Sequence, residues 1–201
     1  TDSSILSSGA VFHPEQALTI PYTGSLALQC MAAGNDSILL AGRSAVHCME
    51  IGSGDSVLFY DGFDKNTRIT ALCQDSEGSV FVGLTQKAAD GNWRAGLQVI
   101  DRDGSFLREI DLSPFLKNSY VTIGGEGSNG QIVRMMADEH YLYLRGIGFQ
   151  DADYMLILDK EGNYVSHMTS DKYHADRLCG MCIGKDGRPY TVIRDENGRL
   201  G

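Results

Sequence analysis

Two short patterns in this sequence contain residue types that perform chemistry in other proteins. The first, Gly125-Glu-Gly127-Ser-Asn-Gly130, has the glycine spacing of a dinucleotide-binding loop. Such a loop requires a helix to begin directly after it, because the helix N-terminus holds the pyrophosphate. Residues 132–136 have the pattern of a strand instead. We therefore interpret the glycines as a loop and predict no bound nucleotide.

The second pattern is Cys179-x2-Cys182, which resembles half of a zinc site. No second Cys or His pair accompanies it at a suitable spacing. Both cysteines lie in a strand-like run, where residues three apart point to opposite faces and do not easily hold one metal ion. A redox role would need a helix start beside a βαβ pattern. We predict neither a metal ion nor a cofactor.

Acidic loop residues are the remaining candidates for catalysis. The run Asp61 to Asn66 and the pair Asp151 and Asp153 offer oxygen ligands, but neither has the spacing of a calcium-binding EF-hand. The histidines stand in no recognised hydrolase motif. We predict exposed acidic turns and no catalytic residue. For a hydrolase, the loop acids available are Asp64, Glu126, Asp151, Asp153 and Asp176.

The composition and charge narrow the possible partners. The net charge of −9 argues against binding to nucleic acid or to an anionic membrane surface, both of which need a cationic surface. No run of ~18 apolar residues is present that would span a bilayer, and the chain opens without a signal-peptide pattern. We expect no membrane span and no nucleic-acid partner.

The number and placement of the cysteines indicate whether the chain forms disulfides, which depends on the cellular compartment. An odd number of them, all in strand-like runs, does not form a disulfide framework, so we predict buried free thiols. This leaves open a reducing compartment or an exported or cell-surface bacterial protein that makes few disulfides. The five cysteines are Cys30, Cys48, Cys73, Cys179 and Cys182.

Residues 69–112 predict four consecutive strands. The apolar runs 69–73, 80–82, 97–100 and 106–110 are short, rich in Val, Ile and Phe, and separated by turns or loops. Runs of this kind bounded by Asp and Gly indicate strands and hairpins. Residues 113–116, Ser-Pro-Phe-Leu, predict a single helical turn.

The rest of the chain repeats this unit. In the first strand of each unit, a branched apolar residue is followed four positions later by Cys or Met. Two of the three intervals are near the ~40–50-residue period of propeller blades, and the interval before Ile132 requires an insertion. We expect the apolar members of these pairs to occupy equivalent places around one axis. The pairs are Leu26 and Cys30, Ile69 and Cys73, Ile132 and Met136, and Leu178 and Cys182.

The repeats predict an all-β fold, a β-propeller of four-stranded antiparallel blades, as a single domain over residues 1–201. The predicted blades are 26–60, 69–112, 132–168 and 178–194. The last unit has two strands, and two spare strands lie within residues 9–20. Propellers usually close their ring, so we predict that residues 9–20 complete the last blade. The alternative is that the chain is a piece of a longer propeller.

The phrases Asp75-Ser-Glu-Gly78-Ser-Val-Phe-Val82 and Leu97-Gln-Val-Ile-Asp-Arg-Asp-Gly104 resemble the NHL-type and two-component-regulator-type bacterial propellers. The resemblance covers residues 26–194. It implies a propeller that acts as a sensor, a binding scaffold or, in some members, an enzyme. Related propellers include metal-dependent sugar-lactone hydrolases, whose channel ligands have no residue-by-residue match here. We predict a non-catalytic binding or scaffold domain of a larger bacterial protein, with a lactonase-type hydrolase as the alternative.

Loop lengths indicate which face binds. Loops after first and third strands are short, whereas those after second and fourth strands are long, and long loops on a rigid scaffold usually carry function. We expect a protein, small-molecule or carbohydrate ligand there. The predicted binding residues are aromatic or charged: Trp93, Arg94, Tyr120, Phe149, Asp151, Asp153, Tyr154, Tyr173, His174 and Arg177.

Overall fold

The strands form antiparallel sheets in the order of the sequence. The structure, a computed structural model, describes residues 28–33, 37–87, 89, 91, 93–116, 131–147, 153–169, 177–184 and 186–194. Three sheets have four strands each, and each of these sheets is called a blade below. The first blade comprises β1 (Cys30–Ala33), β2 (Ser37–Ala41), β3 (Val46–Glu50) and β4 (Ser56–Tyr60).

The second and third blades repeat this order. The second comprises β5 (Thr67–Gln74), β6 (Val80–Lys87), β7 (Trp93–Ile100) and β8 (Phe106–Asp111). The third comprises β9 (Gln131–Ala137), β10 (Tyr141–Ile147), β11 (Asp153–Asp159) and β12 (Tyr164–Thr169). A pair of strands, β13 (Arg177–Ile183) and β14 (Pro189–Arg194), follows. The predicted all-β propeller fold with four-stranded antiparallel blades is confirmed.

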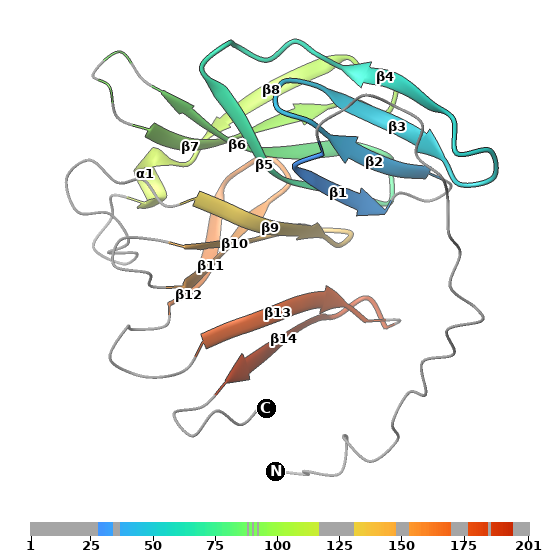
Figure 1. Cartoon of the computed structure of the whole chain (residues 1–201). Coiled ribbons are helices and arrows are strands. Elements are labelled where there is room, and N and C mark those ends of the chain that lie inside the picture. The colour runs from blue at the N-terminus through green and yellow to red at the C-terminus, as the bar shows by residue number, and fades with distance from the viewer. Residues whose placement is uncertain are drawn as a thin grey trace.

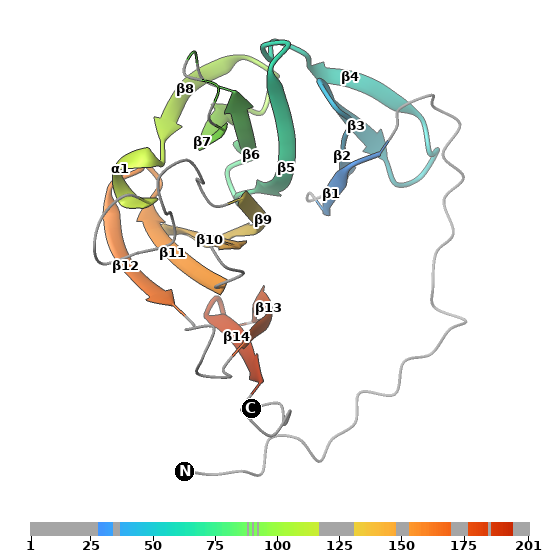
Figure 2. The same ribbon diagram turned by 60° about the vertical axis from the view of Figure 1, so that its left-hand side comes forward.

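The blades are arranged as a fan. The first strands β1, β5, β9 and β13 lie toward the middle, and β4, β8 and β12 lie at the rim (Figures 1 and 2). The fan opens between the first blade and the β13–β14 pair, which lie well apart in both views. The predicted helical turn is present as α1 (Ser113–Leu116) beside the second and third blades. The predicted strands within residues 9–20 lie outside the described residues, so their pairing stays a prediction.

Apolar layers between neighbouring blades form the core. One layer joins the first and second blades and includes Leu39 and Ile69. A second joins the second and third blades and includes Leu97 and Ile132. A smaller layer places Met181 of β13 against Tyr143 of the third blade. Because the second blade is covered on two faces by its neighbours, its inner strands are apolar on both faces, which explains their nearly continuous apolar runs.

A β-bulge follows the branched apolar residue in three of the first strands. Thr70 of β5, Val133 of β9 and Cys179 of β13 have no opposite partner, because the register shifts by one residue at each of them. Ile69, Ile132 and Leu178 therefore occupy equivalent places, as the repeat predicts. Leu26, the fourth member of the set, lies outside the described residues.

The bulge explains why Cys or Met follows after four positions. An extra residue reverses the alternation of faces along the strand. Ile69 consequently packs toward the first blade, while Cys73 packs into the layer with the third. The bulge also overturns the assumption that Cys179 and Cys182 alternate as in a regular strand, since Cys179 is the bulge residue.

The prediction of buried thiols holds only in part. Cys73 is buried, and Cys30 and Cys48 are half-buried, but Cys182 is exposed. All of these described cysteines are free thiols. Burial raises the pKa of the Cys30 thiol to about 11, so it stays protonated at neutral pH. Among the described residues, no further sheet packs on the face of β13 where Cys182 lies, and Cys182 is exposed there.

No helix in the described segments is long and apolar enough to cross a membrane.

Candidate binding face

The two edges of the fan differ in their connections. Turns after the first and third strands of each blade leave from one edge, which we call the turn edge. Loops after the second and fourth strands leave from the opposite edge, which we call the loop edge. The described turns at the turn edge are tight, with glycines at positive φ, as at Gly104 and Gly162. Tight turns leave little room for a ligand, so the loop edge is the better candidate for a binding site.

At the turn edge, aspartate carboxylates accept hydrogen bonds from backbone N–H groups of their own turns. Asp75 Oδ1 accepts hydrogen bonds from the backbone N–H groups of Glu77 and Ser79. Asp159 Oδ1 accepts a hydrogen bond from the backbone N–H of Asn163 in the turn after the third strand of the third blade. Asx-type hydrogen bonds of this kind stabilise turns. These carboxylates serve the fold, which accounts for the acidic character of the turn edge without a ligand.

Asp138, in the turn between β9 and β10, shows how these hydrogen bonds lower the pKa of a turn aspartate. Burial raises its pKa, but hydrogen bonds from the Tyr143 hydroxyl and from the backbone N–H groups of Tyr141 and His140 outweigh burial and hold the pKa below its ordinary value. The Tyr143 hydroxyl lies 2.7 Å from Asp138 Oδ2. A lowered pKa in the folded state stabilises the fold above the ordinary pKa and ceases to do so as the pH falls through the folded value.

We expect Tyr143→Phe to raise the pKa of Asp138 and to destabilise the protein at neutral pH by roughly 0.5 kcal/mol, because the lost hydrogen bond is partly exposed to solvent. The pKa is measured by NMR titration of the Asp138 carboxyl carbon, and stability by urea unfolding at pH 7 and pH 3. The difference between the two proteins should shrink at pH 3. An unchanged Asp138 pKa would contradict this hydrogen bond.

Hollows open at the loop edge, and each contains cationic side chains. One of about 390 Å³ lies at the end of the second blade and includes Lys87 and Arg94 together with Glu109 and Asp111. Another of about 520 Å³ lies beside the first blade and includes Arg43 and Lys65 together with Asp61. A third of about 420 Å³ lies between the first and second blades and includes Arg43 and Arg68. The first two hollows thus carry both basic and acidic side chains, and the third carries basic and neutral polar ones among its described lining residues.

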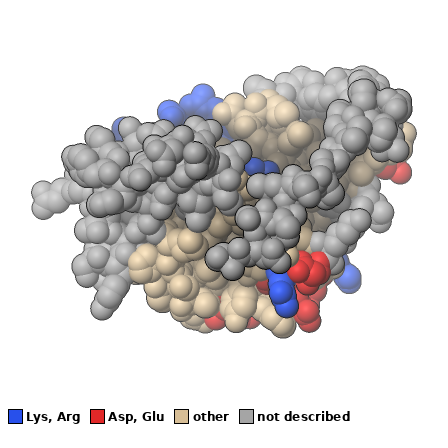
Figure 3. Space-filling view, turned by 90° about the horizontal axis from the view of Figure 1, so that it is seen from below, with Lys and Arg blue, Asp and Glu red and all other residues tan. Residues whose placement is uncertain are grey.

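A space-filling view from below shows the side of the molecule on which the β13–β14 pair lies (Figures 1 and 3). The described atoms on that side are mainly neither acidic nor basic, with basic groups at the upper margin and a mixed acidic and basic cluster at the lower right (Figure 3). Charge is therefore confined to small groups on this side rather than spread as one continuous field.

The predicted binding residues that the structure describes lie at starts of strands on the loop edge. Trp93 and Arg94 begin β7, opposite Lys87 and Gln86. Arg94 is exposed and lines the hollow of the second blade. Asp153 begins β11 and Arg177 begins β13. Tyr120, Phe149, Asp151, Tyr173 and His174 lie outside the described residues.

Tyr154 differs from the other predicted residues because it is buried. Only 1% of its surface is exposed, and its ring lies over Gly146 of the neighbouring strand β10. A Cβ atom on Gly146 would collide with this ring. Tyr154 is consequently a core residue, and the other residues of the set must provide any contact with a ligand.

The acids considered for a hydrolase are only partly described. Asp64 Oδ2 accepts a hydrogen bond from Gln86 Nε2 at 2.9 Å, which ties the linker after β4 to β6. Asp153 lies at the start of β11. Within the described ranges, no three His, Cys, Asp or Glu side chains lie close enough to hold a metal ion. Glu126, Asp151 and Asp176 lie outside these ranges.

Sequence reasoning missed Arg43 and Arg68. Arg43 occupies the short turn between β2 and β3, whereas the predicted binding residues lie in long loops. Arg68 lies near the start of β5, inside what reads as a strand. The order of strands in the sequence could have found Arg43. It follows a second strand, and because strand direction alternates, a residue in that place lies at the loop edge.

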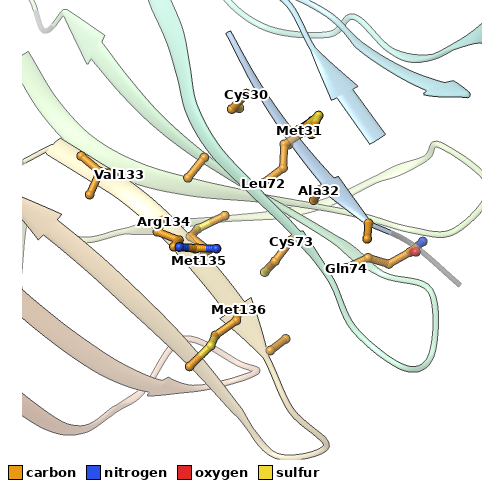
Figure 4. Close-up of a pocket in the computed structure, with 13 residues that line it drawn as sticks. Cys30, Met31, Ala32, Leu72, Cys73, Gln74, Val133, Arg134, Met135 and Met136 are labelled. Atoms are coloured by element: carbon orange, nitrogen blue, oxygen red, sulfur yellow. The ribbon is translucent and has the colours of Figure 1, made fainter. Parts of the chain in front are cut away.

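A further hollow of about 320 Å³ lies along the inner strands β1, β5 and β9. Cys30, Cys73 and Met136 are among its lining residues (Figure 4). These sulfur atoms belong to different layers of the core: Cys30 packs in the first layer, Cys73 in the second and Met136 in the third. They fill gaps between blades and do not converge as metal ligands would.

Comparisons with known proteins support the fold. No protein-family model matches the chain, and no curated protein matches it. Among solved structures, a chain of the mitotic checkpoint complex is similar with a TM-score of 0.53 and 15% identity, over 91% of this chain and 50% of that one. This chain therefore spans about half the length of that protein.

Two further structures show weaker likeness. The extracellular domain of the one component system BT4673 from B. thetaiotaomicron has a TM-score of 0.47 and 12% identity, over 87% of this chain and 22% of that one. The WD40 domain of Neurospora crassa Pan2 has a TM-score of 0.48 and 12% identity, over 87% of this chain and 50% of that one. Both TM-scores lie below 0.5, so the propeller fold rests on the order of the sheets and on the likeness to the chain of the mitotic checkpoint complex.

Proposed function

We propose that this chain is a non-catalytic binding module and that its loop edge takes up the ligand. The observation that carries the proposal is the contrast between the two edges. Hollows lined by Arg43, Lys65, Arg68, Lys87 and Arg94 open at the loop edge. The turn edge is filled by aspartates that hydrogen-bond to their own backbone. A concave surface with a few convergent polar groups is the usual form of a binding site.

The setting we propose is a sensor or scaffold domain of a larger bacterial protein. The Asp-Gly hairpin phrases resemble two-component-regulator-type propellers, a group that includes sensors and binding scaffolds. The blades form a rigid scaffold here, because each blade is packed on its neighbours through buried apolar layers. A rigid scaffold lowers the entropic cost of holding binding residues in place.

NMR spectroscopy tests the proposal. Amide spectra of the isotope-labelled protein are recorded with a panel of sugars, organic acids and short peptides. We expect shifted signals at the loop edge, for example at Arg43, Arg68 and Arg94, with unchanged signals at the turn-edge residues Glu77 and Arg102. Shifts confined to the turn edge would refute the proposal, as would a panel-wide absence of shifts at the loop edge.

A further inference from the structure

The hollow at the end of the second blade, of about 390 Å³, carries charged side chains of both signs. This volume lies within the range of small-molecule sites. Lys87 and Arg94 are the basic residues of its lining, and Glu109 and Asp111 are the acidic ones. All four residues are exposed, so ligands in solution reach them. A ligand of one charge would match only half of this lining.

Lys87 and the two acids lie on different strands and do not pair with each other. Lys87 ends β6, Glu109 and Asp111 lie in β8, and β7 runs between the two strands. Lys87 is opposite Trp93 of β7, and Glu109 is opposite Gln98. At about 3.3 Å per residue and about 4.8 Å between strands, the Cα atoms of Lys87 and Glu109 are roughly 19 Å apart. Among the described residues, Lys87 forms no ion pair with either acid, so a gap separates the opposite charges.

Glu109 and Asp111 form the acidic end of the hollow. They are two residues apart in β8, so their side chains point to the same face of the sheet. Asp111 Oδ1 accepts a hydrogen bond from the backbone N–H of Ser113 at 2.9 Å, which fixes this carboxylate at the start of α1. In the segments that the structure describes, the Glu109 carboxylate makes no hydrogen bond or ion pair. Glu109 is therefore the carboxylate that a ligand cation reaches without displacing a partner.

Lys87 forms the basic end of the hollow. Its backbone N–H donates to the carbonyl of Asn66 at 3.1 Å, which anchors the end of β6 to the linker before β5. Its ammonium group makes no hydrogen bond or ion pair to any residue of the described ranges. Arg94 already takes part in an interaction within the protein, so the contact with a ligand anion is assigned to Lys87 alone. The charge of Arg94 adds to the positive potential at this end.

Gly96 lies between the two ends of the hollow. It is paired with Leu84 of β6 and with Asp111 of β8, and because it has no side chain it leaves space above the sheet for a ligand. A Cβ atom there would lie 3.6 Å from Leu84 Cδ1 and 3.4 Å from the carbonyl oxygen of Ile110, which is ordinary contact. Leu84 and Ala89 make this part of the lining apolar. It suits a ligand with an apolar side chain between its two charges.

We propose that this hollow binds a free α-amino acid with an apolar side chain, with the ammonium group of the ligand on Glu109 and its carboxylate on Lys87. Such a ligand carries both charges and fits the gap that separates Lys87 from Glu109. Hydrogen bonds between charged groups are stronger than neutral ones, so both ends contribute to affinity. This inference rests on the proposed binding role of the loop edge and specifies the ligand class.

L-Leucine is the probe for the NMR test, and two of its derivatives each lack one charge. N-acetyl-L-leucine has no ammonium group, and L-leucinamide has no carboxylate. Leucine should bind with a Kd on the order of 1 mM and shift the amide signals of Gly96 and Asp111. Each derivative should bind about tenfold more weakly, because it loses a hydrogen bond between charged groups. Absence of leucine binding, or equally tight binding of either derivative, overturns the assigned ligand class.

Substitutions assign each charge of the ligand to one end of the hollow. Lys87→Gln should weaken leucine binding about tenfold and leave leucinamide binding unchanged, because leucinamide has no carboxylate for Lys87 to hold. Glu109→Gln should weaken leucine binding about tenfold and leave N-acetylleucine binding unchanged. Both residues are exposed, so the variants should fold. Equal losses for leucine and the corresponding derivative would refute the assigned contacts.

Two further variants locate the ligand. Lys65→Gln is the matched control for Lys87→Gln, because Lys65 is exposed at the loop edge, lines a different hollow and carries the same charge. It should leave leucine binding unchanged, and a loss equal to that of Lys87→Gln would overturn the assignment. Gly96→Ala should weaken leucine binding about tenfold, since one extra methyl group in a pocket has about that effect. Unchanged binding in Gly96→Ala would place the ligand outside this hollow.

The outcome separates this inference from the broader proposal. If leucine does not bind while other panel compounds shift loop-edge signals, the binding role of the edge stands and the assigned ligand class fails. If no compound shifts the loop edge, both fail.

Discussion

Gly104→Ala should destabilise the protein by about 3 kcal/mol. Gly104 lies in the turn between β7 and β8 with φ of 86°, and an L-residue in this region costs about 1–2 kcal/mol. An added Cβ would also lie 2.5 Å from the carbonyl oxygen of Phe59 in β4. Relieving that overlap requires the second blade to move away from the first, which adds roughly 1–3 kcal/mol.

Urea unfolding measures the effect, and Gly187→Ala is its control. Gly187 lies in the hairpin between β13 and β14 with φ of 74°, but nothing lies within 4 Å of its added Cβ. Its substitution should cost about 1–2 kcal/mol from backbone conformation alone. Equal losses in the two variants would contradict the close approach of the β7–β8 turn to β4.

The equivalent turn of the third blade repeats this contact. Gly162 lies between β11 and β12 with φ of 96°, and its added Cβ would meet the side chain of Ile110 in β8 at 2.8 Å. In both cases the turn after a third strand rests on the fourth strand of the preceding blade. Glycine is needed there for two reasons, the positive φ and the close approach between blades.

Asp75→Ala should have a comparably large effect, about 3–5 kcal/mol. The Asp75 side chain is 2% exposed and accepts the ammonium group of Lys160 at 3.1 Å, from the third blade. It also accepts the backbone N–H groups of Glu77 and Ser79. Alanine would leave two backbone donors and a largely buried ammonium group, 16% exposed, without this partner.

Companion variants separate the two roles of Asp75. Asp75→Asn keeps an acceptor for the turn and loses only the charge, so we expect a loss of about 1–3 kcal/mol. Lys160→Met replaces the buried ammonium with an apolar group and should cost less than Asp75→Ala, because the turn keeps its carboxylate. A double-mutant cycle of Asp75→Ala and Lys160→Met measures the coupling. Strict additivity would contradict the contact between blades.

The sequence predicted the strands and the turns well, because both depend on local chemistry. The Asp-x-x-Gly phrase at 101–104 and the apolar run 106–110 require only neighbouring residues to be recognised. The helical turn at 113–116 follows from equally local signals. Propeller blades are consecutive in sequence, so local accuracy was sufficient to recover the order of the sheets.

The bulges and the site were harder to predict. A bulge at Thr70 leaves no mark in composition, and the assumption of strict alternation did not anticipate the register shift at Cys179. Tyr154 adjoins a loop in the sequence. Gly146 on the neighbouring strand β10 has no side chain, and the Tyr154 ring fills the space that this leaves. The hollow between Arg43 and Arg68 depends on how two blades pack, which no single segment determines.

The exposed face of the β13–β14 pair has a consequence for synthesis on the ribosome. Cys182, Tyr190 and Val192 lie exposed on that pair, and Tyr190 is paired with Cys182 in the sheet. Cys73 occupies the corresponding place of the second blade and is buried by the third. During translation from the N-terminus, every newly made blade must therefore expose an apolar face until the next blade is synthesised and covers it. Nascent chains paused between blades are the species that need protection by a chaperone.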